Sequence, residues 1–374
     1  MPSKPNRTVN FLVTAALQAP SADNSQPWHF NWDGSDLAVN YDADRVAGLT
    51  FPSNDPATLL SVGGVIENLT QAAAHLGLRI EPGELAATDS KAAIHVRMKL
   101  GPEEPAELPC TGRDLPLFHR HTNRLSFKHH TLPEDLTAWI PAEGELNASA
   151  AVITDPYKIR HIAKLVRSAS EIRFQTREVH EWLAKSLRFN PSEVGRGDGL
   201  DVATLALPPA GGLFLKFISD WRRMAFLNRF GAFRMLSVID AAPIGKAPAL
   251  VAITSPAGAE QVVAAGRLLT RLWTRLNAEG VAVHPYYVIP DQLQRLKQKR
   301  IPEHLITRAR DLEHQASRLF ALHDNSTELR MLLRIGYPKK KPIRSRRLPL
   351  QAVFTDSSNK LATDPNGAQL QDKV

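Results

Sequence analysis

The sequence predicts an α+β fold made of two related halves. Strand-like and helix-like segments alternate along the chain, two of the helix-like segments resemble each other, and the composition is that of a globular protein. Of the 374 residues, 43% are hydrophobic and 22% are charged, which is ordinary for such proteins. A chain of this length can bury one large core or two modest ones. We therefore expect sheets covered by helices.

Strands are expected where apolar and polar residues alternate and β-branched residues are frequent. Such segments cover 37–42, 92–100, 148–155, 249–255 and 331–338. Long helices are expected over 157–188 and 213–238. Because helices and strands are interleaved along the chain, the pattern favours a layered α+β arrangement.

Two helix-like segments share residue types at one constant spacing. Gly63, Leu69, Gly77 and Pro82 in the first correspond to Gly266, Leu272, Gly280 and Pro285 in the second. Apolar residues in both recur in steps of three and four, which is typical of a buried helix face. Asp55 and Pro56 are the expected start of the first helix, and Gly77 and Gly280 are the expected ends. The repetition suggests that one unit has been duplicated.

We expect an N-terminal half over 8–112 and a C-terminal half over 118–355. The second half is expected to carry a helical insertion at about 160–240. The polar stretch 356–374 is expected to be a disordered tail.

Several classes of function lose support from the sequence. No run of about 18 apolar residues is present, and the first residues lack the pattern of a signal peptide, so we expect no transmembrane segment and a cytoplasmic location. Cys110 is the only cysteine, which excludes an intrachain disulfide. The motifs of serine hydrolases, zinc peptidases, P-loop proteins and dinucleotide-binding folds are absent.

Histidine and basic residues are abundant, but neither points to a metal or to nucleic acid. His119, His121, His129 and His130 form no helical i,i+4 pair, so we expect no metal site. The net charge is +8, and its one dense cluster, KKKPIRSRR at 339–347, has no interleaved aromatic residues. We therefore expect Lys339, Lys340 and Lys341 to be solvated and no nucleic acid to bind.

The stretch APSADNSQPWHF at 19–30 carries the most specific motif. It contains Pro20, Ser21, Asn24, Gln26, Pro27 and Trp28, and it resembles the flavin-facing loop of the FMN-dependent nitroreductase superfamily. The resemblance implies that Pro20, Ser21, Asn24 and Gln26 approach the flavin, since a ring with carbonyl and N–H groups needs fixed donors and acceptors within an apolar slot. Trp28 is expected in the core.

Two basic segments resemble the phosphate-binding elements of the same superfamily. One is Arg120-His121-Thr122-Asn123-Arg124, in which His121 stands where a second arginine is common in the family. The other contains Arg344, Arg346 and Arg347, followed by Leu-Pro. Guanidinium groups donate paired, charge-assisted hydrogen bonds to a phosphate. Which of the three C-terminal arginines contacts phosphate is left open.

The order of these elements resembles the double-length, Acg-type NAD(P)H nitroreductases over residues 8–355. The resemblance implies a nitroreductase-like fold in which two tandem halves form an internal pseudo-dimer with one complete FMN site. It also implies NADH or NADPH as a transient donor and a nitro compound, a quinone or a similar small molecule as acceptor. No catalytic side chain is assigned, and further oligomerisation is left open.

The insertion has three alternative roles. Phe214, Phe217, Trp221, Phe226, Phe230 and Phe233 lie among Lys216, Arg222, Arg223, Arg229 and Arg234. The segment could be a lid over the flavin, and a lid that does not open would make the protein a flavin store rather than a reductase. It could also lie on a membrane surface. The simplest alternative is that the aromatic residues pack in the core of the second half.

Overall fold

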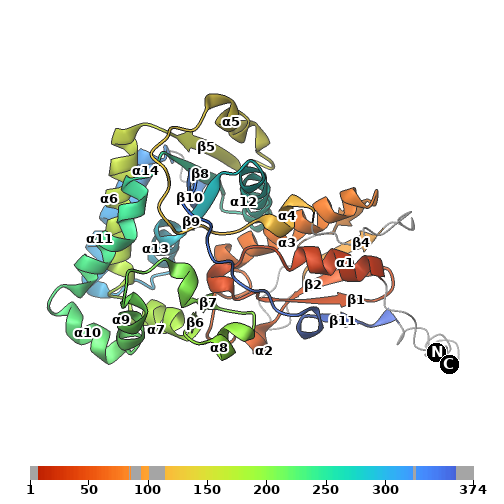
Figure 1. The fold of residues 1–374 in the computed structure, drawn as a ribbon, viewed down its shortest axis with the longest axis horizontal. Coiled ribbons are helices and arrows are strands. Elements are labelled where there is room, and N and C mark those ends of the chain that lie inside the picture. Colours follow the sequence, from red (N-terminus) through yellow and green to blue (C-terminus); the bar gives the residue numbers. More distant parts are fainter. Residues whose placement is uncertain (1–6, 84, 86–93, 101–113, 323–325, 359–374) are drawn as a thin grey trace, which may run out of the picture.

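Two sheets organise the structure, one in each half of the chain. The computed structural model describes residues 7–83, 85, 94–100, 114–322 and 326–358. The strands of the first sheet are β1 (Trp28–Trp32), β2 (Asp36–Tyr41), β3 (Ile80–Pro82), β4 (Ile94–Leu100) and β11 (Phe354–Asp356). Those of the second are β5 (Ser149–Ile153), β8 (Ala249–Pro256), β9 (Ala282–Tyr286) and β10 (Thr327–Gly336). The predicted mixture of helices and sheets is confirmed (Figure 1).

Helices pack against the sheets, and six of the described helices lie between β5 and β8 in the sequence. The helices outside this insertion are α1 (Arg7–Ala16), α2 (Ala43–Val46), α3 (Pro56–His75), α4 (Pro116–His119), α5 (Glu134–Ala138), α12 (Ala259–Ala278), α13 (Val288–Lys297) and α14 (Ile306–Leu319). The insertion contains α6 (Pro156–Arg173), α7 (Arg177–Ser186), α8 (Pro191–Gly195), α9 (Gly211–Ile218), α10 (Trp221–Asn228) and α11 (Ala232–Gly245), with the short strands β6 (Leu187–Arg188) and β7 (Leu200–Asp201). Among the described helices, none has the length and apolar character needed to cross a membrane.

The two sheets pair their strands in the same order. The orders are β1-β2-β4-β3, with β11 added beside β1, and β5-β8-β10-β9. In each half a 20-residue helix, α3 or α12, follows the second strand. Asp55 caps α3 as predicted, because its carboxylate accepts a hydrogen bond from the backbone N–H of Ala57 at 2.9 Å. Gly77 and Gly280 follow α3 and α12 with φ of 71° and 79°, the left-handed conformation that favours glycine at helix ends.

Helices α3 and α12 cross in direct contact, and glycine makes this contact possible. A Cβ atom on Gly63 would lie 2.1 Å from the carbonyl oxygen of Val263, and one on Gly266 would lie 2.2 Å from that of Leu60. The two contacts are reciprocal. Val263 lies three positions before Gly266, and Leu60 lies three positions before Gly63. Buried Glu67 adds ion pairs across the crossing, to Arg271 at 3.1 Å among others. The two halves therefore meet along a tightly packed helix pair.

The C-terminal segment returns from the second half to the first. After β10 it crosses the molecule and ends in β11, which pairs in parallel with β1, as Phe30 with Phe354 (Figure 1). We expected a disordered tail over 356–374, but Asp356 belongs to β11, and the N–H of Ser357 donates to the carbonyl of Trp32 at 2.7 Å. Residues 359–374 lie outside the described residues.

The two long helices expected in the second half are divided. The segment 157–188 forms α6 and α7, and 213–238 forms α9, α10 and part of α11. Asp220 begins α10 by accepting hydrogen bonds from the N–H groups of Arg222 and Arg223, and Gly231 precedes α11 with φ of 87°. Asp220 and Gly231 lie within a segment that is otherwise rich in apolar residues. The apolar pattern therefore predicted one helix over this segment, and the two breaks were missed. Trp28 is buried in the core as predicted.

Candidate functional site

The loop after α1 lies on the crossing of α3 and α12. A Cβ atom on Gly64 would lie 3.0 Å from the Cδ of Pro20 and 2.8 Å from the Oγ1 of Thr270, so glycine is needed for the loop to approach α3. Asp23 and Gln26 have φ of 50° and 49°, which is costly for residues other than glycine and concentrates at functional sites.

Asn24 and Gln26 join this loop to two distant parts of the chain. The Asn24 side-chain amide donates to the carbonyl of Gly199 in the insertion at 3.1 Å and to that of Arg346 at 3.1 Å. The Gln26 amide donates to the carbonyl of Gly197 at 2.9 Å. Both side chains are buried, and these bonds hold the insertion and the C-terminal segment against the loop. Their predicted approach to a flavin stays a prediction.

The segment 120–124 is fixed between α12 and β9. The N–H of His121 donates to the Asn277 side chain at 2.8 Å, and the indole N–H of Trp273 donates to the carbonyl of His121 at 2.9 Å. The N–H of Asn123 donates to the carbonyl of Val283 in β9 at 2.9 Å. Thr122 is half-buried on this segment. These bonds fix the backbone of the segment that carries Arg120, Thr122 and Arg124.

Arg120, Arg344 and Arg347 gather beside the end of α1, and we call them the arginine cluster. The guanidinium groups of Arg120 and Arg347 both donate to the carbonyl of Gln18, at 2.6 and 3.5 Å. That of Arg344 donates to the carbonyl of Arg120 at 3.3 Å. Arg344 and Arg346 are both exposed, whereas Arg347 is half-buried. The structure thus brings together one arginine of the first basic segment and two of the three C-terminal arginines.

The arginine cluster carries positive charge without a neutralising carboxylate. Among the described residues, none of its three members has a carboxylate oxygen within 4.0 Å. Burial, together with the neighbouring Arg347 and Arg344 charges, lowers the pKa of Arg120 well below its usual range. Burial and Arg344 lower the pKa of Arg347 to about 10. Buried charges are ordinarily paired, so this group fits an anionic ligand.

Unpartnered hydrogen-bond donors in the cluster lead to the same conclusion. Within the described part of the chain, the buried Nε atoms of Arg120 and Arg347 have no hydrogen-bond partner. The Arg120 guanidinium also stacks 4.6 Å from the ring centroid of Trp273, which fixes its plane. A phosphate group offers the charge and the several acceptor oxygens that these donors lack.

A second polar group lies around Arg124, where the insertion meets β9. The guanidinium of Arg124 donates to the carbonyl of Thr204 in the insertion at 3.4 Å. The rings of His284 and Tyr286 in β9 lie 4.4 Å apart, and the Tyr286 hydroxyl donates to the carbonyl of Asp240 in the insertion at 3.3 Å. Burial, reinforced by the charge of Arg124, lowers the pKa of His284 well below its usual range. The neutral form of the His284 ring is therefore favoured.

Sequence reasoning missed His284, Tyr286 and Arg45. Arg45 pairs with Asp42 at 2.8 Å and donates to the carbonyl of Ser25 at 3.1 Å and to that of Gln26, so it fixes the loop from outside. No spacing in the sequence links Arg45 to the loop. His284 and Tyr286 lie two residues apart in β9, and the sequence pattern singled out only Pro285 between them, as part of the repeat.

The described surface also has a cleft of about 450 Å³ between α13, α14 and β10. Its lining includes Tyr287, Lys297, Glu328 and Arg330 and none of the predicted site residues. Glu328 pairs there with Lys297 at 2.6 Å and with Arg330 at 2.7 Å. Because Glu313 and Glu328 balance Lys297 and Arg330 in the lining, the cleft differs from the arginine cluster.

Comparison with known proteins gives distant likenesses. No family model matches the chain. It is 28% identical over 215 residues to the "Uncharacterized protein MT1398" of Mycobacterium tuberculosis (strain CDC 1551 / Oshkosh), a match that covers 55% of this chain and 28% of that protein. The chain thus spans less than a third of the length of that relative.

Similar solved structures are FMN-dependent nitroreductases and a related flavoprotein. One is the FMN and NADPH-dependent nitroreductase NfnB from Sphigopyxis sp. strain HMH (17% identity, 64% of this chain and 96% of that one, TM-score 0.35). Another is the FMN-dependent nitroreductase NfnB from Mycobacterium smegmatis in complex with NADPH (13%, 65% and 96%, TM-score 0.37). A third is a BluB-like flavoprotein from Clostridium difficile 630 (14%, 66% and 99%, TM-score 0.37). Likenesses at these scores are distant and assign no function to the chain.

Proposed function

We propose that the protein is an FMN-dependent oxidoreductase that transfers electrons from NADH or NADPH to a nitro compound, a quinone or a similar small acceptor. The observation that carries this proposal is the arginine cluster, in which buried guanidinium donors have no carboxylate partner among the described residues. The motif resemblance in the loop at 20–26 supports the choice of FMN among phosphate-bearing ligands.

Each part of the site has a role in this proposal. Arg120 and Arg347 hold the FMN phosphate, Arg344 adds positive charge, and Thr122 lies between the phosphate end and Arg124. The loop from Pro20 to Gln26 faces the flavin ring. When bound, FMN supplies the two-electron chemistry, and the protein orients it and limits access.

The two halves then form a fused pseudo-dimer with one complete site. The repeated strand order and the reciprocal glycine contacts of α3 and α12 support this. The loop comes from the first half, whereas Arg120, Arg124 and the C-terminal arginines come from the second. One chain therefore supplies both sides of a site that would otherwise need two subunits.

A second function, flavin sequestration, is favoured by one observation. The side chains of Asn24 and Gln26 hold the backbone of Gly197 and Gly199 against the loop. A lid fixed by buried hydrogen bonds would retain flavin and exclude a nicotinamide donor. In this alternative the site binds FMN but does not turn over.

FMN binding is tested by two single substitutions in the C-terminal segment. Arg347→Ala should weaken FMN binding by about tenfold or more, since a hydrogen bond to a charged group contributes about 1.5–3 kcal/mol. Arg346→Ala is the matched control, because it removes an equal charge from an exposed side chain. Quenching of flavin fluorescence measures both affinities. Equal affinities for the two variants, or no saturable binding to the unmodified protein, would contradict the proposal.

A further inference from the structure

The insertion exposes large apolar side chains to solvent. On α9, α10 and α11, and in the link between α10 and α11 that holds Phe230, they are Leu213, Phe214, Phe217, Phe226, Phe230, Met235, Val238 and Ile239. Phe230 is 77% exposed and Leu213 is 76% exposed. The expectation that these aromatic residues pack in the core is therefore wrong for Phe214, Phe217, Phe226 and Phe230, and only Trp221 and Phe233 are half-buried.

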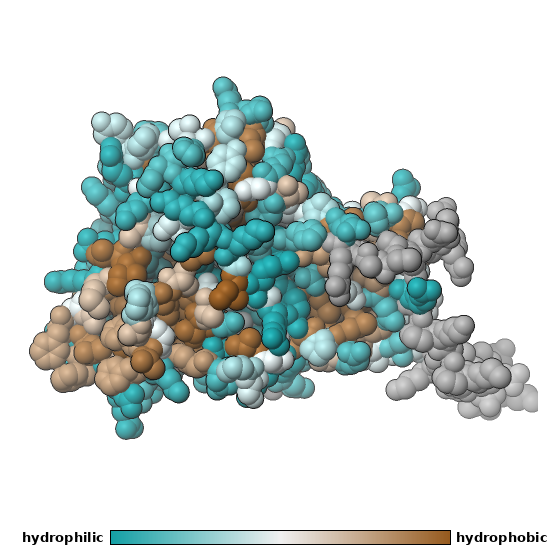
Figure 2. Space-filling model, in the orientation of Figure 1, coloured by the Kyte–Doolittle hydropathy of each residue, from teal (hydrophilic) through white to brown (hydrophobic). Residues whose placement is uncertain are grey.

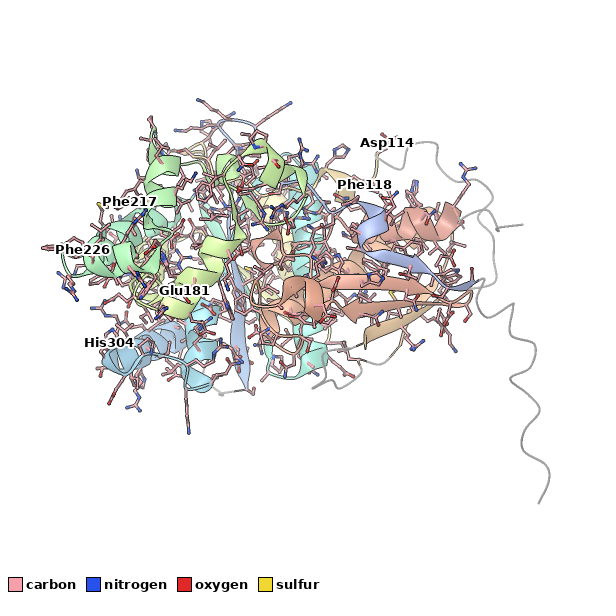
Figure 3. All side chains as sticks on the ribbon, turned by 90° about the horizontal axis from the view of Figure 1, so that it is seen from below. Asp114, Phe118, Glu181, Phe217, Phe226 and His304 are labelled. Carbon is pink, nitrogen blue, oxygen red and sulfur yellow. The ribbon has the colours of Figure 1, made fainter. Side chains whose placement is uncertain are left out.

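These side chains lie together on one end of the molecule. Figure 2 shows the apolar surface gathered at the lower left, where Figure 1 places α9 and α10. Figure 3 shows Phe217 and Phe226 at the outer edge of the insertion, far from Phe118. The rings of Phe226 and Phe230 contact each other edge-on, with centroids 5.3 Å apart. We call residues 211–239 the insertion surface.

The insertion surface is also strongly basic. It has one acidic residue, Asp220, and five basic residues: Lys216, Arg222, Arg223, Arg229 and Arg234. All five are exposed, and in the described ranges none has a carboxylate oxygen within 4.0 Å. Other arginines of the second half are paired, as Arg295 is with Asp291 at 2.9 Å.

We propose that the insertion surface binds the surface of an anionic lipid bilayer. Aromatic and aliphatic side chains of this kind enter the boundary between headgroups and acyl chains, while the basic side chains pair with lipid phosphates. A contiguous apolar patch on a soluble surface marks an interaction site. The unpaired cations beside it select a negatively charged partner.

The charge pattern disfavours a second copy of the chain as the partner. In a symmetric dimer the same patch faces itself, so five unpaired cations would meet five others. An anionic bilayer instead neutralises all five. The insertion surface shares no residue with the arginine cluster, so this proposal goes beyond the proposed FMN chemistry and does not depend on it.

Flotation with lipid vesicles tests this inference. The full-length protein is mixed with vesicles of phosphatidylcholine alone or of equal parts phosphatidylcholine and phosphatidylglycerol. We expect binding to the anionic vesicles only. Replacing Arg222, Arg223 and Arg229 with Gln should weaken that binding by about a hundredfold, because each basic residue near such a surface contributes about 1 kcal/mol.

Two further variants separate a specific surface from general charge attraction. Replacing Phe217, Phe226 and Phe230 with Ser leaves the charge unchanged and should also abolish binding. Replacing Lys339, Lys340 and Lys341 with Gln removes three charges elsewhere and should leave binding unchanged. Circular dichroism verifies that each variant is folded.

Three results would overturn the inference. They are no binding to anionic vesicles, an equal loss in the lysine variant, and a concentration-dependent dimer that the Phe→Ser variant dissolves while vesicle binding is absent. The last result, measured by sedimentation velocity, would assign the insertion surface to self-association.

Discussion

Replacing Arg120 with Met should change stability and ligand affinity in opposite directions. Arg120 is 5% exposed, and burial and two neighbouring arginines lower its pKa well below the usual range. In protein without FMN this buried charge lowers the stability of the folded state, because no carboxylate among the described residues offsets it. Methionine is unbranched and of similar length, so it preserves the packing against Trp273.

The magnitude follows from two opposing terms. Replacing buried ion pairs with apolar residues of similar volume is often neutral or stabilising, by up to about 4 kcal/mol, and an unpaired buried charge lacks even the attraction of a partner. The substitution also removes the hydrogen bond from Arg120 to the carbonyl of Gln18, which costs about 1 kcal/mol. We therefore expect the free energy of unfolding of the FMN-free protein to rise by up to about 3 kcal/mol, and FMN affinity to fall by about tenfold or more.

Urea denaturation of FMN-free protein and an FMN titration measure the two effects. Arg295→Met is the control, since Arg295 is equally buried but pairs with Asp291 and Glu178 at 2.9 Å. Breaking that pair should destabilise the protein by about 3–5 kcal/mol. If Arg120→Met destabilised the FMN-free protein as much as Arg295→Met does, Arg120 would stabilise the fold, and its proposed role in binding a phosphate would be contradicted.

Two further predictions concern α3 and its crossing with α12. Burial raises the pKa of Asp55 to about 6, above the value of about 3.9 in the unfolded chain. The folded state therefore binds the Asp55 proton more tightly than the unfolded state does. The free energy of unfolding consequently falls as pH rises from about 3.9 to about 6. Asp55→Asn keeps the helix cap and should raise the free energy of unfolding by about 3 kcal/mol at about pH 8, but by about 1 kcal/mol or less at about pH 4.5; a pH-independent difference in urea denaturation would contradict this. Gly266→Ala forces a Cβ atom to 2.2 Å from the carbonyl oxygen of Leu60 and should destabilise the protein by about 2 kcal/mol or more, whereas Gly195→Ala, where nothing lies within 4 Å, should not. If these two glycine variants had equal midpoints of thermal unfolding, α3 and α12 would have moved apart at no cost in stability, and the prediction would be wrong.

Local signals in the sequence predicted the ends of α3 and α12 and most strands. Asp55, Gly77 and Gly280 have capping roles that depend on near neighbours alone, so α3 and α12 were predictable. β1 was missed because WHFNW was interpreted as part of the motif at 19–30. β11 was missed because its stability comes from pairing with β1, more than three hundred residues away in sequence.

The sequence predicted which residues belong to the candidate site, but not how deeply each side chain is buried or what it contacts. The sequence identified Arg120 and the C-terminal arginines, yet only the folded chain distinguishes Arg347, whose Nε is buried, from exposed Arg346. The bonds from Asn24 and Gln26 to Gly199 and Gly197 span about half the chain, and nothing local encodes them. The exposure of the aromatic residues on α9 and α10 depends on the breaks at Asp220 and Gly231, which turned one expected helix into three.

The proposed function requires that this site binds FMN and that a nicotinamide donor reduces the bound flavin. The most direct measurement is the visible absorption spectrum of the FMN-loaded protein, recorded without oxygen while NADPH and then NADH are added. Rapid bleaching of the flavin band by either donor is the predicted result, and the oxidised band should return when a quinone or a nitro compound is added. A bound flavin whose band neither donor bleaches would contradict the reductase account and favour sequestration beneath the insertion.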